Sequence, residues 1–243
     1  MLNNIIGAII LLAYYLLVLA ALPAILATCK KIPSEWIRKI QHIGYSMSVF
    51  LLVRLFDTWY AAVLAASLLI LLAYPALLLL EKTPFCRRWL VDRRPRGGEL
   101  RKQLLIIQLT FALLLFIFWG LLGRQWHWLI PVAVMAWGFG DAAAALVGKF
   151  WGKRHIIHRW IEGAKTWEGT GAMMAFAAAA VFLTMFFYGH QPWYICIAAA
   201  VTVGPICAFV ELFSKRGSDT FTVPLSVALL ILPLVYLFSK LGL

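Results

Sequence analysis

The sequence predicts an all-α integral membrane protein, a polytopic bundle of about eight transmembrane helices. Hydrophobic residues make up 63% of the 243 residues, and the mean hydropathy of +0.88 is far above that of soluble domains. Only 13% of the residues are charged, and they cluster in short stretches between long apolar runs. No internal repeat or low-complexity linker divides the chain, so we expect a single membrane-embedded domain over residues 1–243.

Eight apolar runs come near the roughly 20 residues that a helix needs to cross the hydrocarbon core. The runs are 5–27, 43–56, 58–80, 104–122, 126–147, 170–188, 193–213 and 221–238. The second run is short, but Pro33 allows its helix to start near Ser34. Arg38, Lys39 and His42 would then lie in the headgroup region, where long side chains extend toward water.

Lysine and arginine residues predict the orientation, because positive residues are retained on the cytoplasmic side. Alternate loops hold nineteen of the twenty-two: four in 28–41, eight in 81–103, five in 149–168 and two in 214–220. The connections on the other side contain a single Lys or Arg residue, Arg124. We therefore expect a multi-pass protein of the plasma membrane with both termini outside and its polar loops in the cytoplasm. Since these loops explain the net charge of +12, no nucleic-acid partner is predicted.

Two carboxylates near membrane depth are functional candidates, because a charge is costly there. Asp141 follows two glycines, Gly138 and Gly140, which could break the helix. Asp141 would then cap a second half-helix that starts at Ala142. Glu211 lies in the last turn of the seventh run. The structural alternatives are an Asp141 bonded to a neighbouring helix and a Glu211 that reaches the interface.

A third carboxylate, Asp219, lies where the chain re-enters the membrane. It either caps the eighth helix or joins the other two as a metal ligand. The predicted orientation places five polar residues near one membrane face: Asp141, Lys165, Glu168, Glu211 and Asp219. Carboxylates with a lysine suit a Mg²⁺-nucleotide, in which the metal bridges phosphate oxygens. We therefore expect Mg²⁺, with Asp141, Glu211 and Asp219 as its ligands.

The loop 148–171 combines glycines with lysines. Glycines let backbone N–H groups approach a polyphosphate, lysines neutralise its charge, and a helix N-terminus offers further donors. The alternative is a basic interfacial loop that grips anionic lipid, which explains the charges and tryptophans but not the glycines. The expected nucleotide-binding residues are Gly148, Lys149, Gly152, Lys153, Lys165, Thr166, Gly169 and Thr170.

Four short blocks, spread over most of the chain, match motifs of a known family. Residues 38–44 are similar to R-K-x-x-H-x-G, 140–148 to G-D-x-x-A-x-x-x-G, and 165–170 to K-[ST]-x-E-G-[ST]. Residues 211–225 are similar to an E…D-[NT]-x-T-[VI]-P-L ending, with Thr220 where asparagine is frequent. In these blocks the chain resembles the polyprenol kinase family, which includes dolichol kinase, phytol kinase and the CTP-dependent diacylglycerol kinase.

The resemblance implies a lipid kinase that transfers a phosphoryl group from a nucleoside triphosphate, with CTP common in the family. The acceptor is the hydroxyl of a membrane lipid alcohol, such as a polyprenol, phytol, geranylgeraniol or diacylglycerol. Asp141 would bind Mg²⁺ or deprotonate this hydroxyl, Lys165 would hold the triphosphate, and Glu168 would be a further base or ligand. The matching blocks add four other candidates, which are Arg38, His42, Lys215 and Thr222.

Two other functions compete with this one. A phosphatidate cytidylyltransferase also uses CTP and Mg²⁺, but its K-R-x-x-x-x-K-D and P-G-H-G-G signatures are absent from this sequence. A non-enzymatic lipid transporter would also use intramembrane carboxylates and broken helices. However, the outer halves of the predicted helices hold almost no ionisable residues apart from Arg54 and Asp57. The first observation favours a kinase over a cytidylyltransferase, and the second favours an enzyme at the membrane interface over a transporter.

Overall fold

The computed structural model describes residues 1–243 except 29–31, 81–98, 216 and 242–243. Most of the basic loop 81–103 therefore lies outside the described residues. The helices form two compact units, Met1–Leu121 and Leu122–Leu243, which we call the N-terminal and the C-terminal unit. Whether the chain is a single domain, as expected from the sequence, stays a prediction.

The N-terminal unit begins with one long helical segment, α1 (Leu2–Tyr15), η1 (Leu16–Ala21) and α2 (Leu22–Thr28), in which η1 is a π-helix. It continues with α3 (Ser34–Leu55), α4 (Trp59–Leu80) and α6 (Glu99–Leu114), and α6 extends into the π-helical η2 (Leu115–Leu121). The predicted start of the second helix at Ser34 is confirmed. Extended backbone at Pro33 sets this boundary, because proline favours the position just before or inside a helix start.

Aromatic residues hold α1 against α3. The rings of Tyr15 and Tyr45 stack with their centroids 5.1 Å apart, and the hydroxyl of Tyr15 lies 3.1 Å from Ser48 Oγ. Tyr14 donates a hydrogen bond of 2.6 Å to the carbonyl of Gly44. These contacts fix the register of the two helices.

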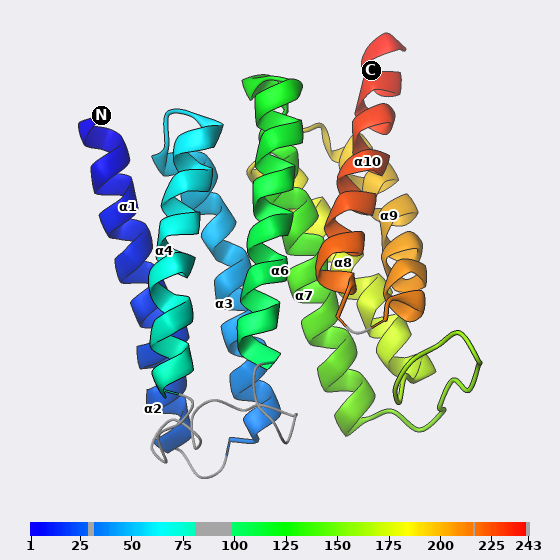
Figure 1. Cartoon of the computed structure of the whole chain (residues 1–243). Helices are drawn as coiled ribbons and strands as arrows, with labels where there is room; N and C mark the ends of the chain where they lie inside the picture. The colour runs from blue at the N-terminus through cyan, green and yellow to red at the C-terminus, as the bar shows by residue number, and fades with distance from the viewer. Residues whose placement is uncertain (29–31, 81–98, 216, 242–243) are drawn as a thin grey trace. The chain divides into compact units, whose positions relative to one another are not determined.

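The C-terminal unit contains the short 3₁₀ helix η3 (Arg124–Trp126) and four long helices. These are α7 (Leu129–Phe150), α8 (Trp167–Phe187), α9 (Trp193–Phe213) and α10 (Asp219–Lys240). Helix α8 packs against α7 and α9, and α10 packs against α7 and α9 (Figure 1). Successive helices run in opposite directions, so the end of α7, the start of α8, the end of α9 and the start of α10 lie at one end of the unit (Figure 1). We call this the polar end and define it as residues 148–169, 211–215 and 217–219.

Six segments of the described chain are long and apolar enough to cross a membrane. They are Leu2–Thr28, Lys102–Leu121, Arg124–Phe150, Trp167–Phe187, Trp193–Phe213 and Asp219–Lys240. The protein is therefore an all-α, multi-pass membrane protein. Helix α3 is not among these segments, and the described apolar part of α4 ends at Leu72, so the count of eight spans stays a prediction.

Helix α7 runs unbroken from Leu129 to Phe150, so the expected break before Asp141 is wrong. Gly140 serves packing instead. A Cβ at Gly140 would lie 2.6 Å from Met173 Sδ and 3.3 Å from the Cβ of Ala177 on α8. The absent side chain thus lets α8 approach α7 while the helical hydrogen bonds continue. Asp141 consequently lies within α7 and not at the start of a helix.

Candidate active site

The junction between α7 and α8 depends on close contacts that glycine permits. Thr166 is the N-cap of α8, and its Oγ1 accepts a hydrogen bond of 3.1 Å from the N–H of Gly169. A Cβ at Gly169 would lie 2.9 Å from the carbonyl oxygen of Ala144, and one at Gly152 would lie 2.2 Å from that of Gly148. The glycines therefore pack the end of α7 against the start of α8, and their contact with a nucleotide stays a prediction.

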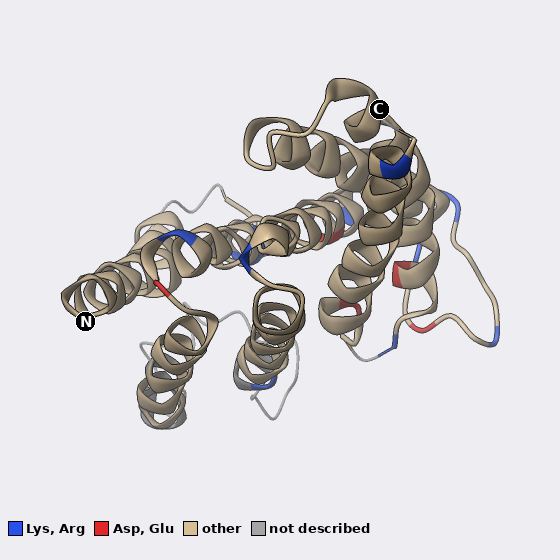
Figure 2. Cartoon of the chain, turned by 90° about the horizontal axis from the view of Figure 1, so that it is seen from above, with Lys and Arg blue, Asp and Glu red and all other residues tan. Residues whose placement is uncertain are grey.

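The loop before α8 folds back on itself. The N–H of Ile156 donates to the carbonyl of Lys165 at 2.8 Å, and that of Trp167 donates to the carbonyl of Arg154 at 3.0 Å. Glu168 Oε2 accepts a hydrogen bond of 3.3 Å from the N–H of Arg154. Figure 2, which views the chain from above, shows basic and acidic residues along this loop. The fold-back gives Lys165 and Glu168 defined positions at the start of α8.

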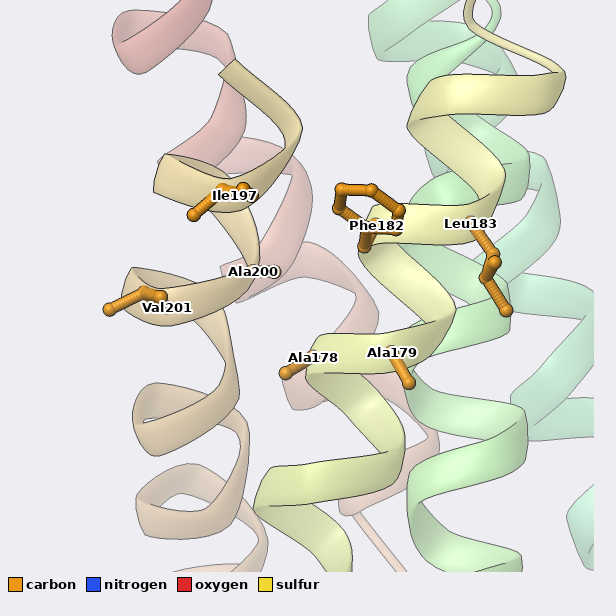
Figure 3. Close-up of a pocket in the computed structure, with 7 residues that line it drawn as sticks. All are labelled: Ala178, Ala179, Phe182, Leu183, Ile197, Ala200 and Val201. Carbon is orange, nitrogen blue, oxygen red and sulfur yellow. The ribbon is translucent and has the colours of Figure 1, made fainter. Parts of the chain in front are cut away.

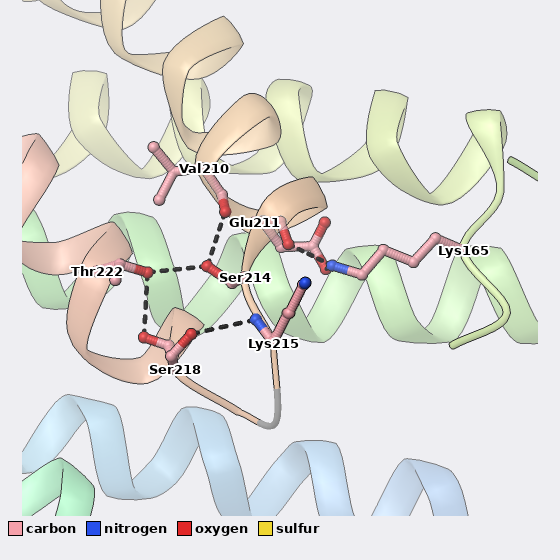
Figure 4. A network of polar contacts seen from close by, with 7 residues as sticks. All are labelled: Lys165, Val210, Glu211, Ser214, Lys215, Ser218 and Thr222. Atoms are coloured by element: carbon pink, nitrogen blue, oxygen red, sulfur yellow. Dashed lines mark hydrogen bonds and ion pairs between the residues drawn. The ribbon is translucent and has the colours of Figure 1, made fainter. Parts of the chain in front are cut away.

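An ion pair joins this loop to the end of α9. Lys165 Nζ lies 2.8 Å from Glu211 Oε1 and also donates to the backbone carbonyl of Glu211 (Figure 4). The two side chains are 19% and 14% exposed. Glu211 lies in the last turn of α9, as predicted. A lysine ammonium has three N–H donors, and Glu211 accepts hydrogen bonds from two of the three donors of Lys165.

Hydroxyl groups hold the turn between α9 and α10 (Figure 4). Ser214 Oγ and Thr222 Oγ1 lie 2.9 Å apart, and Thr222 Oγ1 donates to the carbonyl of Ser218 at 3.0 Å. The N–H of Lys215 donates to Ser218 Oγ at 3.2 Å. Thr222, a predicted site residue, therefore fixes this turn. Ser214 and Ser218 were missed, although hydroxyl residues on both sides of a short turn between helices are a recognisable signal.

The remaining carboxylates come from α7 and α10. Asp141 lies one helical turn before Ala144, the residue that contacts Gly169, which is roughly 5 Å along the axis of α7. Asp219 lies in the first turn of α10, where a negative charge complements the helix dipole, and Ser218 holds the N-cap position. The predicted acidic residues thus come from four helices, with Glu168, Glu211 and Asp219 at the polar end and Asp141 about two turns before it on α7.

The fit of these residues to Mg²⁺ can be tested on their arrangement. Among the described residues, no three His, Cys, Asp or Glu side chains come close enough to hold a metal ion by themselves. Mg²⁺ bound to a nucleotide, however, commonly takes one or two carboxylates and completes its shell with phosphate oxygens and water. The absence of a three-ligand cluster among the described residues is compatible with that kind of site. The ligand set Asp141, Glu211 and Asp219 stays a prediction.

Two predicted site residues, Arg38 and His42, belong to α3 of the N-terminal unit. Arg38 Nε lies 3.2 Å from Glu35 Oε1, and the two residues form an ion pair. Lys39 is 3% exposed, so the expected extension of its side chain toward water is wrong, while its place in the headgroup region stays a prediction. The role of Arg38 and His42 in binding a nucleotide or lipid stays a prediction.

Comparison with known proteins finds a relative for most of the chain. A phytol kinase of Synechocystis sp. is 35% identical over 207 residues, which cover 82% of this chain and 78% of the relative. No family model matches the chain, and no solved structure matches it. The similarity therefore extends beyond the four short motif blocks.

Proposed function

Because this chain belongs to the polyprenol and phytol kinase family, we propose that it transfers the terminal phosphoryl group of CTP, or of another nucleoside triphosphate, to a membrane lipid alcohol. The protein is a phosphotransferase that acts on a lipid alcohol. CTP as the donor, Mg²⁺ as the cofactor and the identity of the alcohol are parts of the proposal. Polyprenols, phytol, geranylgeraniol and diacylglycerol are the candidate acceptors.

The ion pair between Lys165 and Glu211 is the observation that best supports the location of the site. It joins the motif at the start of α8 to the motif at the end of α9, which lie 46 residues apart in the chain. Both motifs lie at the polar end, where the positive end of the α8 helix dipole favours an anion. A triphosphate bound there would lie at the boundary between water and lipid, within reach of a lipid hydroxyl.

The reaction needs positioning and neutralisation of charge more than covalent catalysis. The hydroxyl oxygen of the lipid attacks the γ-phosphorus, the bond from this phosphorus to the bridging oxygen breaks, and the nucleoside diphosphate leaves. We assign Asp141 first, and Glu168 second, to accept the hydroxyl proton. The third N–H donor of Lys165 would bind a phosphate oxygen. Mg²⁺, held by one or two of the carboxylates of Asp141, Glu211 and Asp219, would offset the charge of the triphosphate.

The loop residues divide into two groups in this proposal. Gly148, Gly152, Gly169 and Thr166 pack against one another, so they would shape the backbone that faces the nucleotide. Lys149 and Lys153 have exposed side chains, so they would neutralise the phosphates. Thr170 lies in the first turn of α8, and exposed Lys215 lies after α9.

A purified-protein assay in detergent tests this proposal. Labelled CTP and ATP are each incubated with a panel of lipid alcohols, and both the lipid and the nucleotide products are separated. A kinase gives a phosphorylated lipid and a nucleoside diphosphate, and chelation of divalent cations with EDTA should stop it. Release of pyrophosphate would identify a cytidylyltransferase instead, and a transporter would give neither product.

A further inference from the structure

An apolar groove lies between α8 and α9. Its volume is about 370 Å³, it is largely open on one side, and no polar atom lines it. Figure 3 shows the ring of Phe182 directed from α8 toward α9, with Ala178 one turn away. Small or apolar side chains make up the lining, among them Ala178, Ala179, Phe182, Ile197, Ala200 and Val201.

The groove begins where a close contact between the two helices ends. A Cβ at Gly204 would lie 2.9 Å from the carbonyl oxygen of Met174 and 3.0 Å from the Cβ of Ala178. The backbones therefore approach closely at Gly204, as small residues allow inside a membrane. About one turn before Gly204 in α9, at Ala200 and Val201, the helices have separated enough to form the groove. The groove thus lies on the side of this contact that faces away from the polar end.

The groove and the candidate active site lie on the same two helices. Ala178 lies ten residues beyond Glu168 on α8, and Val201 lies ten residues before Glu211 on α9. Ten residues of α-helix rise about 15 Å, which is half of the roughly 30 Å thickness of the hydrocarbon core. The groove therefore begins about one leaflet deep, measured from the polar end.

We propose that this groove holds the distal part of the hydrocarbon chain of the lipid-alcohol substrate and so selects for long chains. The inference rests on the proposed function. With its hydroxyl at the polar end, a lipid alcohol in the bilayer lies alongside α8 and α9, and only the part of its chain beyond about 15 Å reaches the groove. An apolar lining offers no partner to a headgroup, so a hydrocarbon chain is the occupant that fits.

The selectivity should be moderate. Lipid tails are as apolar as the groove, so a chain that moves from the bilayer into the groove gains packing contacts without a hydrophobic driving force. Packing gains between apolar groups in a membrane correspond to about a three- to tenfold preference in kcat/KM for a chain that fills the groove.

Two substitutions that narrow the groove test this inference. Val201 is 67% exposed and Ala179 is also exposed, so Val201→Phe and Ala179→Phe add bulk from the open side without displacing the core. Leu229→Phe on α10 is the matched control, because Leu229 is 53% exposed and lies outside the lining. Both groove variants should raise the KM for geranylgeraniol about three- to tenfold and leave the KM for the short alcohol geraniol unchanged. The control should change neither value.

A second measurement detects the chain directly. A geranylgeraniol analogue with a photoreactive diazirine at its far end should label peptides that contain residues 178–183 or 197–201, and unlabelled geranylgeraniol should compete. An active wild-type enzyme whose variants keep its chain-length preference would overturn this inference alone, as would labelling that only phospholipid displaces. A wild-type protein that phosphorylates no alcohol would overturn the proposed function, and this inference with it.

Discussion

Asp141 lies inside an unbroken helix at membrane depth, where a carboxylate is retained at a considerable cost in free energy. Asp141→Asn keeps the shape of the side chain and removes its charge. We expect turnover to fall about 100-fold or more, because the variant loses either a metal ligand or the base for the lipid hydroxyl. The measurement is the initial rate of lipid phosphorylation by the purified variant.

The control for this variant is Asp57→Asn, since Asp57 is an exposed carboxylate in the connection after α3. It should retain wild-type activity. An Asp141→Asn protein that still turns over at the wild-type rate would remove Asp141 from the proposed chemistry.

The ion pair of Lys165 and Glu211 stabilises the packing of α8 against α9, and Lys165 is also proposed to bind the triphosphate. Exchanging the two charges separates these two roles. Each single variant, Lys165→Glu or Glu211→Lys, places like charges side by side and should lower stability by about 1–2 kcal/mol, since the pair is only partly exposed. The double variant restores opposite charges and should recover most of that loss. Thermal unfolding in detergent measures these changes.

Turnover should not recover in the double variant, because a glutamate at position 165 repels the triphosphate. A double variant with wild-type turnover would show that Lys165 serves only to hold α9. The sequence placed Glu211 in the last turn of a helix, and this position is confirmed. It did not predict that Lys165 and Glu211 pair, because that contact depends on how α8 packs against α9.

At the scale of single helices, boundaries followed from local signals. The predicted run 193–213 coincides with α9, because Pro192 precedes it and polar residues follow it. The break predicted in α7 is wrong, because glycines in a membrane helix serve close packing as well as bending, and only the neighbouring helix decides between the two.

The contact between Gly152 and Gly148 gives a prediction about the α7–α8 junction. In Gly152→Ala the new Cβ would meet the carbonyl oxygen of Gly148, a backbone atom, so the loop must shift. We expect a loss of about 1–3 kcal/mol in stability, as for other overpacked sites. The midpoint of thermal unfolding in detergent should fall accordingly.

Gly171 offers the matched control for this change. It lies within α8, and nothing lies within 4 Å of a Cβ built there. Gly171→Ala should leave stability unchanged or raise it by up to about 1 kcal/mol, because alanine favours helix. Equal effects of the two substitutions would contradict the packing role of Gly152.

At the scale of the whole molecule, the distribution of Lys and Arg predicts the side of each loop. In a variant without the native cysteines, His190→Cys, in the connection between α8 and α9, should react with a membrane-impermeant maleimide on intact cells. His158→Cys, in the loop before α8, should react only after the membrane is permeabilised. The reverse pattern would place the proposed active site outside the cell.

The sequence predicted the class of the fold because apolar length and charge distribution determine which segments a bilayer accepts. That the acidic residues lie near one membrane face stays a prediction, although Glu168, Glu211 and Asp219 do share one end of the C-terminal unit. The contacts within that site depend on helix packing, such as those of Thr166 with three glycines, and a linear pattern does not contain them. Helix α3, which carries Glu35, Arg38 and Lys39, lacks the apolar signal that marks the other spans.

The burial of α7 has a consequence for biosynthesis. Of the six apolar segments in the described chain, the one with α7 is the least apolar and the most buried. A ribosome delivers it to the translocon before α8, α9 and α10 exist, so Asp141 first meets lipid, at a cost of about 2.5–3.5 kcal/mol. Whether the α7 segment stays in the bilayer then depends on helices that are still being synthesised. A nascent chain that stops at Phe150 should therefore be a substrate for membrane quality-control proteases, whereas the full-length protein should persist.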